Sequence, residues 1–225
     1  MAKGPFDPRY EDLPERIPVF PLSGVLLLPR GRLPLNIFEP RYLAMIRDAL
    51  GLSERLIGMV QPKEDEGLGA GVIPGEPALS RVGCAGRIVS FAETGDGRYV
   101  IELKGVARFT IKSEPPRELE YRMASVDWTI YRGDLEEPPH FVDRERFMKA
   151  LKPYFAQRGI DPDWRALEAL MDDRLVIMVA MLAPFSAPEK QALLLAADTG
   201  QRAELLIGLM EMAVRANSGP PPQMN

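Results

Sequence analysis

The apolar positions of the chain change their spacing near residue 140. Before that point, short apolar runs are separated by glycine, proline and charged residues, which is typical of short β-strands joined by turns. After it, apolar residues recur at helical spacing almost to the end of the chain. The pattern therefore predicts a β-rich first part followed by a helical second part.

The first part has seven strand-like runs, which we expect to supply five or six short strands, and one inserted helix. The helix is expected at 40–51, where apolar residues share one face, Pro40 suits the first turn and Gly51 suits the exit. Thr-Gly-Asp-Gly at 94–97 has hairpin-turn chemistry. Short strands in this number favour a small closed or nearly closed barrel. Strand-like runs lie at 16–22, 33–38, 55–62, 80–93, 98–105, 107–114 and 121–131.

The second part is predicted to be a bundle of helices. Asp161 is expected to cap one helix with Pro162 in its first turn, and Ser186 and Glu189 have the spacing of a capping box. The run 175–182 is apolar on every side, which places its helix at the bundle centre. The helices are predicted at 140–158, 162–183, 187–197 and 200–216.

These patterns predict an α+β chain of two domains. A β-barrel with one inserted helix is expected at 16–131, and a four-helix subdomain at 140–216, with a linker at 132–139 between them. The flanking segments lack apolar periodicity. We expect a flexible N-terminus over 1–15 and a disordered tail over 217–225.

Composition and charge exclude several classes of protein. The chain has 225 residues, of which 46% are hydrophobic and 27% charged, as in ordinary globular domains. A net charge of −4 argues against nucleic acid as the partner. The chain shows no apolar signal core and no apolar run near the roughly 20 residues of a membrane span, so we expect a cytoplasmic protein without a membrane partner.

Candidate catalytic and metal-ligating residues are few. Cys84 and His140 are the single cysteine and the single histidine, which excludes a disulfide framework and a thiolate or imidazole zinc site. Cys84 is expected to be a packed core residue. The glycine-rich stretch 67–71 and the acidic run 64–66 lack the context of a dinucleotide loop and the spacing of a calcium loop. No catalytic, cofactor-binding or metal-binding residue is therefore predicted.

Five aromatic residues in predicted strands allow two interpretations. Such residues form stacking platforms in proteins that bind single-stranded RNA, and they also fill the interiors of ordinary barrels. The acidic charge balance favours the barrel core. They are Phe91, Tyr99, Phe109, Tyr121 and Trp128.

The stretch 18–42 resembles the start of the N-terminal, substrate-binding domain of the ATP-dependent Lon protease family. It carries Pro-Val-Phe-Pro-Leu at 18–22, an apolar loop ending in proline at 25–29, and Leu-Pro-Leu-Asn-Ile-Phe-Glu-Pro-Arg-Tyr at 33–42. Within the last motif, Glu39 and Arg41 are expected to pair locally, and each proline is expected to end one short segment.

The resemblance continues along the chain. The hairpin region and the residues Gly105, Arg108 and Phe109 resemble the family's next strands, and the helical end carries Pro184 and the Glu-Lys-Gln-Ala-Leu-Leu of 189–194. Roughly residues 16–215 are covered. The resemblance implies a PUA-like β-barrel followed by a helical bundle. The chain shows no P-loop and no recognisable Ser–Lys dyad, so we expect neither the ATPase nor the protease activity of the Lon protease.

The function that the resemblance implies is a non-enzymatic module that binds unfolded or apolar polypeptide segments. The proposed contact residues are Leu26, Leu27 and Leu28, rimmed by Arg30 and Arg32. This hypothesis requires that the leucines be exposed. The alternative is that they belong to the core, as most leucines do.

Two further functions stay open at this point. The chain could be an adaptor or regulator that docks on another protein, such as a Lon protease, and helical ends of such domains can mediate self-association as a homodimer. The PUA-like barrel also occurs in RNA-binding proteins, which is a fold-level analogy that the acidic charge balance opposes.

Overall fold

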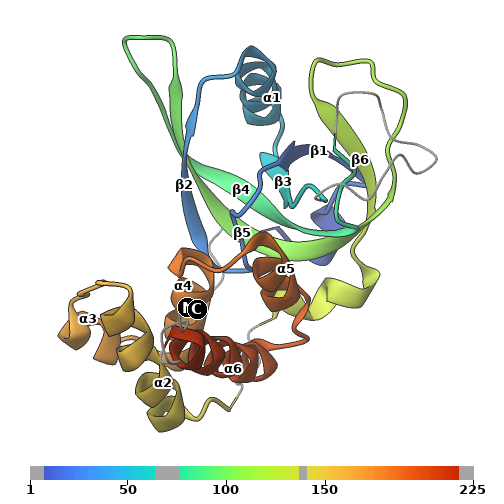
Figure 1. Cartoon of the computed structure of the whole chain (residues 1–225). Coiled ribbons are helices and arrows are strands. Elements are labelled where there is room, and N and C mark those ends of the chain that lie inside the picture. Colours follow the sequence, from blue (N-terminus) through green and yellow to red (C-terminus); the bar gives the residue numbers. More distant parts are fainter. Residues whose placement is uncertain (1–7, 64–76, 137–140, 218–225) are drawn as a thin grey trace, which may run out of the picture. The chain divides into compact units, whose positions relative to one another are not determined.

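The computed structural model describes residues 8–63, 77–136 and 141–217 (Figure 1). Contacts between residues divide the described chain into two compact units. The first unit holds the residues up to 136 together with Phe185–Leu194, and the second holds 141–184 and 195–217. Strands occur in the first unit and helices in both, so the fold class is α+β, as the apolar pattern predicts.

The first unit is built from a mixed sheet with helical segments around it (Figure 1). Most of its strands lie close to their predicted positions, because short apolar runs bounded by glycine, proline and charged residues mark them in the sequence. In chain order they are η1 (Tyr10–Asp12), β1 (Arg16–Pro21), β2 (Arg32–Ile37), α1 (Pro40–Leu50), β3 (Leu56–Val60), β4 (Val82–Glu93), β5 (Tyr99–Ser113), β6 (Arg122–Asp127), η2 (Thr129–Leu135) and α5 (Ala187–Leu195), whose last residue falls in the second unit.

The sheet closes into a small barrel. β1 pairs in parallel with β3 and antiparallel with β6, while β4 pairs antiparallel with both β3 and β5. β6 also pairs with β5, so the order β5-β4-β3-β1-β6 returns to β5. β2 pairs only with β5 among the described strands and therefore forms an outer edge.

The barrel core is apolar and includes the packed N-terminal segment. The Phe109 ring meets Trp128 edge to face at 5.7 Å between centroids. Trp128 Nε1 donates a hydrogen bond to the Pro14 carbonyl oxygen at 2.9 Å, and Tyr10 and Leu13 pack against the core. Tyr10, Leu13 and Pro14, which fall in the segment expected to be flexible, are therefore held by contacts with the barrel.

Helix α1 has the ends that the sequence predicts. Pro40 occupies its first turn and Gly51 follows its last residue. Arg41 Nε donates to Glu39 Oε2 at 3.0 Å, so the predicted local pair is confirmed. The buried face of the helix carries Tyr42, Met45, Ile46 and Ala49.

Three predicted strand runs differ from the strands observed. The runs 98–105 and 107–114 are one continuous strand, β5. Residue 106 between them is as buried as its neighbours, and the pairing with β4 continues on both sides of it after a register shift. The run 121–131 ends as a strand at Asp127, where the Asp127 carboxylate accepts hydrogen bonds from Thr129 and starts η2 instead.

The second unit contains α2 (Arg144–Gln157), α3 (Trp164–Glu168), α4 (Asp172–Leu182) and α6 (Thr199–Asn217). α2 and α6 run parallel, because Arg146 pairs with Glu204 near their starts and Gln157 Nε2 donates to the Val214 carbonyl oxygen near their ends. No helix among the described residues is long and apolar enough to cross a bilayer.

The single helix predicted at 162–183 is two helices. Arg144 donates to the carbonyl oxygens of Glu168 and Leu170 at 2.7 and 2.9 Å, which satisfies the C-terminal end of α3. The same guanidinium pairs with Asp172 in the first turn of α4. The cap of α3 is Asp163, which accepts from Ala166 N at 3.1 Å, rather than Asp161 as predicted.

Candidate functional site

The three leucines proposed as contact residues are buried. Leu26, Leu27 and Leu28 expose 2%, 1% and 0% of their surface, so the exposure that the hypothesis required is absent. Leu27 lies against Gly86 in β4, where an added Cβ would come within 2.7 Å of it. The leucines contribute to the barrel core, which was the alternative interpretation.

The loop that carries the leucines is fixed by hydrogen bonds at both ends. The Gln61 side chain accepts from Gly24 N at 2.9 Å and donates to the Val25 carbonyl oxygen. Arg30 N donates to the Gly105 carbonyl oxygen at 2.8 Å, and Gly105 N donates to Gly31 at the same distance. A loop held in this way directs its apolar side chains inward.

The two arginines of the proposed site differ in exposure and in their surroundings. Arg30 is half-buried and has a positive φ of 67°, at the turn that follows the leucines. Arg32 is exposed at the start of β2 and pairs with Glu102 of β5. The five residues therefore do not form one surface.

An apolar surface does occur elsewhere in the first unit, on three paired strand segments. We call these segments the arm: β2, residues 88–93 of β4 and residues 99–104 of β5. In register across the arm, Leu35 lies opposite Ile101 and Ile101 opposite Phe91. Residues opposite one another point to the same side of a sheet. One side, which we call the arm face, thus carries Leu33, Leu35, Ile37, Ile88, Phe91, Tyr99, Ile101 and Leu103, with the charged Glu93 opposite Tyr99 at the tip.

The other side of the arm is mostly polar. Arg32, Asn36 and Lys104 lie on it, and Glu102 pairs there with Arg32. Val100, with 43% of its surface open to solvent, and Ala92 opposite it are exposed apolar residues on this side. The arm is therefore amphipathic, with the alternation that a sheet covered on one side requires.

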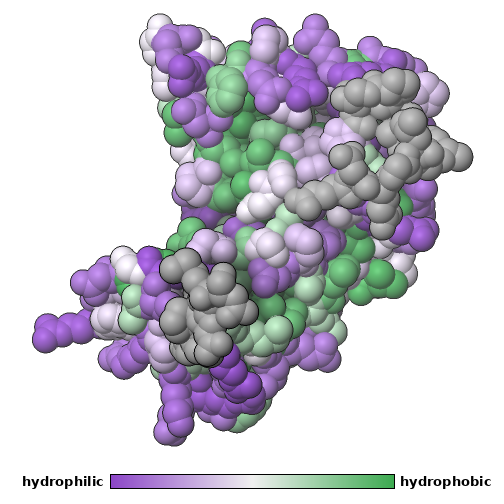
Figure 2. Space-filling model, in the orientation of Figure 1, coloured by the Kyte–Doolittle hydropathy of each residue, from purple (hydrophilic) through white to green (hydrophobic). Residues whose placement is uncertain are grey.

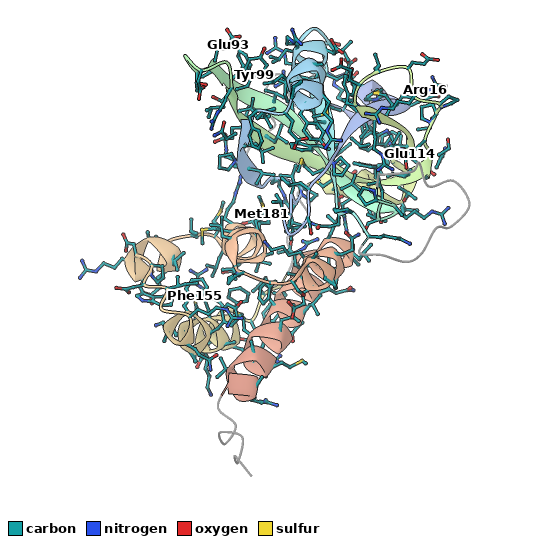
Figure 3. The ribbon with its side chains drawn as sticks, turned by 45° about the horizontal axis from the view of Figure 1, so that its top comes forward. Arg16, Glu93, Tyr99, Glu114, Phe155 and Met181 are labelled. Atoms are coloured by element: carbon teal, nitrogen blue, oxygen red, sulfur yellow. The ribbon has the colours of Figure 1, made fainter. Side chains whose placement is uncertain are left out.

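The arm face is only partly covered. Phe91 exposes 41% of its surface and packs edge to face on Tyr99 with centroids 5.0 Å apart, while Leu33 and Leu35 are half-buried. Phe38, which follows β2, exposes 63%. Apolar side chains show at the surface between α1 and the arm in Figure 2, and Figure 3 places Tyr99 near the hairpin tip on the side of α1.

The two free edges of the arm differ. Pro34 lies in the middle of β2 and has no backbone N–H to offer a further strand, which protects that edge. Beyond Ile88, whose N–H donates to the Arg55 carbonyl oxygen at 3.0 Å, β4 pairs only with β5 among the described strands. Residues 89–93 of β4 contain no proline, so this edge keeps its backbone donors.

The other chemical candidates lie in the core or outside the described residues. Cys84 is fully buried, as expected for a packed residue. Of the five aromatic residues, all but Phe91 are less than a tenth exposed, which agrees with the core interpretation. The described residues hold no group of three or more potential metal ligands. The stretch 67–71, the run 64–66, His140 and the tail beyond Asn217 lie outside the described residues.

Arg108 of β5, one of the residues that carry the family resemblance, forms a buried ion pair with Asp134 of η2. Arg108 donates from Nε and Nη2 to the two carboxylate oxygens of Asp134 at 2.9 and 2.7 Å, and from Nη1 to the Leu194 carbonyl oxygen at 3.1 Å. Burial lowers the pKa of the Arg108 guanidinium, and the Asp134 carboxylate more than reverses this effect, so that the pKa is raised. The pair joins β5 to η2 and α5.

The family-like residues of α5 attach this helix to the barrel. Glu189 and Ser186 form the predicted capping box, in which Glu189 Oε2 accepts from Ser186 N at 2.7 Å. Lys190 Nζ donates to the Gly24 carbonyl oxygen at 2.7 Å, and Gln191 Nε2 donates to the Val82 carbonyl oxygen at 3.2 Å. Burial lowers the pKa of the Lys190 ammonium. These motif residues therefore have structural roles.

Replacing Lys190 by methionine is expected to destabilise the first unit by about 1–3 kcal/mol, because the partly buried Gly24 carbonyl oxygen loses its donor. Urea unfolding followed by far-UV circular dichroism measures the change. Lys149→Met, at an exposed position of α2, is the matched control and should change the free energy of unfolding by less than about 0.5 kcal/mol. Equal effects of the two substitutions would contradict the role assigned to Lys190.

Comparison with known proteins identifies the family. Residues 16–212 match the model of the ATP-dependent protease La (LON) substrate-binding domain. Lon protease 2 of Myxococcus xanthus is 32% identical over 117 residues, which cover 52% of this chain and 13% of that protein. The chain thus spans a small part of the length of this relative.

Solved structures show the same fold. A Lon N-terminal domain protein from Xanthomonas campestris superposes with a TM-score of 0.57 at 24% identity, covering 86% of this chain and 97% of its own. The N-terminal domain of the Mycobacterium avium complex Lon protease gives the same TM-score at 16% identity, with 87% and 98% covered. Since the family model spans most of the chain and the fold agrees, this protein belongs to the Lon substrate-binding domain family.

Proposed function

We propose that the chain is a polypeptide-binding domain that takes apolar, extended segments of other proteins on the arm face. The observation that carries the proposal is a partly open apolar sheet surface around Phe91 and Tyr99, next to a strand edge with available backbone donors. An extended segment can add to such an edge through main-chain hydrogen bonds and place alternate side chains on the arm face. The family's description as a substrate-binding domain supports this role.

We also propose that the role is binding rather than catalysis. Two described residues that could act as nucleophile or base are engaged otherwise: Cys84 is buried, and Lys190 donates to a carbonyl oxygen. Nucleophilic catalysis needs an activated group beside a partner in a pocket, and neither residue has that setting. Prolonged incubation with unfolded polypeptides tests this role. We expect the polypeptides to be bound and their length to stay unchanged.

Replacing Phe91 by serine is expected to weaken binding of an unfolded polypeptide by about 5-fold or more, because a partly exposed aromatic ring is the type of residue that dominates contact energy. The probe is a reduced and carboxymethylated protein carrying a fluorophore, and the readout is fluorescence anisotropy.

Val100→Ser is the matched control for this experiment. Val100 lies on the polar side of the same hairpin with nearly the same exposure as Phe91, 43% against 41%. Its substitution should leave the affinity unchanged. Equal losses for the two variants, or an affinity that Phe91→Ser does not alter, would refute the arm face as the binding surface.

A further inference from the structure

A second surface of the first unit carries two neighbouring cavities at the other end of the barrel. The first, of about 170 Å³, is lined by Arg16 and by the β5–β6 loop with its residues Pro116 and Leu119. The second, of about 120 Å³, lies between α1 and the same loop. Arg117, Tyr121 and Arg122 line both cavities. In Figure 3, Arg16 and Glu114 mark this region, away from Glu93 and Tyr99 on the arm.

The second cavity is lined by three arginines, two of which pair with carboxylates outside its lining, Arg41 with Glu39 and Arg122 with Glu114. Arg41, Arg117 and Arg122 line it, and none of the described residues that line it is acidic. Its remaining walls are tyrosine and proline: Tyr42 and Tyr121 with Pro21, Pro62 and Pro77. Apolar walls reduce the local dielectric constant and strengthen the attraction of arginine for an anion.

The walls of this cavity are held in place. Arg122 makes a bidentate pair with Glu114 at 2.7 Å and donates to the Pro77 carbonyl oxygen at 2.8 Å. The Tyr121 hydroxyl donates to Asp48 Oδ2 at 2.7 Å, and burial, followed by this bond, raises the pKa of Tyr121. The Arg41 guanidinium lies over the Tyr42 ring at 4.6 Å. Such support reduces the ordering that binding would otherwise require.

The first cavity adds a cation and apolar contacts. Arg16 is exposed and forms no ion pair with any described residue. Glu114 and Glu118 also line this cavity, so its charge is nearly balanced except at Arg16. Leu119 exposes 43% of its surface beside it. The two cavities together thus offer Arg41 in one and Arg16 in the other, with Arg117, Tyr121 and Arg122 lining both.

We propose that these cavities form a second binding site, which takes an acidic polypeptide segment. One carboxylate side chain enters the second cavity between Arg41 and Arg117, and another reaches Arg16. Apolar side chains between them contact Tyr121 and Leu119. Both cavities are much smaller than the 300–1,000 Å³ typical of cofactor and drug-sized ligands, which favours single side chains over a whole small molecule. This site is separate from the arm face and does not depend on the function proposed there.

The test is a fluorescence anisotropy titration with two short labelled peptides, one alternating Glu and Leu and one alternating Gln and Leu, both acetylated and amidated. The acidic peptide should bind at least about 10-fold more tightly, and this difference should shrink at high salt. Equal affinities would overturn the proposal. Binding that appears only when the C-terminal carboxylate is left free would also overturn it, because the anion would then be a chain end.

Matched variants locate the site. Arg41→Gln should reduce affinity for the acidic peptide by about 10-fold, and Arg16→Gln by a smaller factor. Arg47→Gln changes the net charge equally, on an exposed position of the same helix outside both cavities, and should leave the affinity unchanged. An equal loss in Arg47→Gln would show diffuse attraction and refute the site.

Two further measurements separate this site from other functions. A single-stranded RNA oligomer that displaced the acidic peptide at lower concentration would assign the cavities to nucleic acid and overturn the proposal. In the presence of excess acidic peptide, the Arg41→Gln variant and the unsubstituted chain should have the same affinity for the unfolded, carboxymethylated protein at the arm face. The two proposals can therefore fail independently.

Discussion

The variant Gly105→Ala is expected to lose on the order of 3–5 kcal/mol of unfolding free energy. A Cβ at this position would overlap the Leu28 carbonyl oxygen and lie 2.8 Å from its carbon and 3.3 Å from the Pro29 Cα. These are backbone atoms, so no side-chain rotation relieves the overlap. Moving the loop would also break the hydrogen bonds from Arg30 N to Gly105 and from Gly105 N to Gly31.

Tryptophan fluorescence during urea unfolding measures this effect in the correct unit. The chain has two tryptophans, with Trp128 in the barrel and Trp164 at the start of α3. In a Trp164→Phe background the signal reports the barrel. Gly95→Ala is the control, since an added Cβ there meets no described atom within 4 Å. A midpoint for Gly105→Ala close to that of Gly95→Ala would show that the loop can yield, contrary to the expectation.

Replacing Arg108 by methionine is expected to destabilise the first unit by about 3–5 kcal/mol. Arg108 and Asp134 expose only 6% and 10% of their side chains, so the substitution leaves a carboxylate in the interior without its countercharge. The Leu194 carbonyl oxygen loses its donor in the same variant. We therefore expect the amides of α5 to exchange with deuterium faster than those of β3 and β4.

A second substitution distinguishes a lost ion pair from lost packing. The double variant Arg108→Met with Asp134→Leu should recover much of the stability, because removing both charges also removes the uncompensated carboxylate. Arg98→Met breaks an exposed pair with Asp96, whose side chains are 52% and 58% open, and should lower the stability far less than Arg108→Met. A double variant less stable than Arg108→Met alone would contradict this account.

Local sequence signals predicted local structure well. Pro40, Gly51 and the pair of Ser186 and Glu189 determine helix ends through contacts within a few residues, and each was predicted correctly. The two helices in place of one at 162–183 could not be predicted, because the contacts that end α3 come from Arg144, more than twenty residues away in the chain. Apolar periodicity does not reveal contacts between residues so far apart in the chain.

The candidate site shows the same limit. The run of three leucines is visible in the sequence, but its direction depends on Gln61 and Lys190, which bind the loop from distant elements. Conversely, alternation in 33–37 and 99–103 is visible, yet the arm face arises only when the register between β2, β5 and β4 is known. Register is a property of pairing, which one strand alone does not specify.

The attachment of α5 to the barrel has a consequence for the order of synthesis. Residues 185–194 belong to the first unit, although α2, α3 and α4 of the second unit precede them in the chain. Lys190, which donates to the Gly24 carbonyl oxygen, and Leu194, which accepts from Arg108, are synthesised only after those three helices. Contacts of such sequence separation form late and slow folding. The nascent barrel thus stays incomplete while most of the second unit is being made, and truncation before residue 185 removes part of the first unit as well.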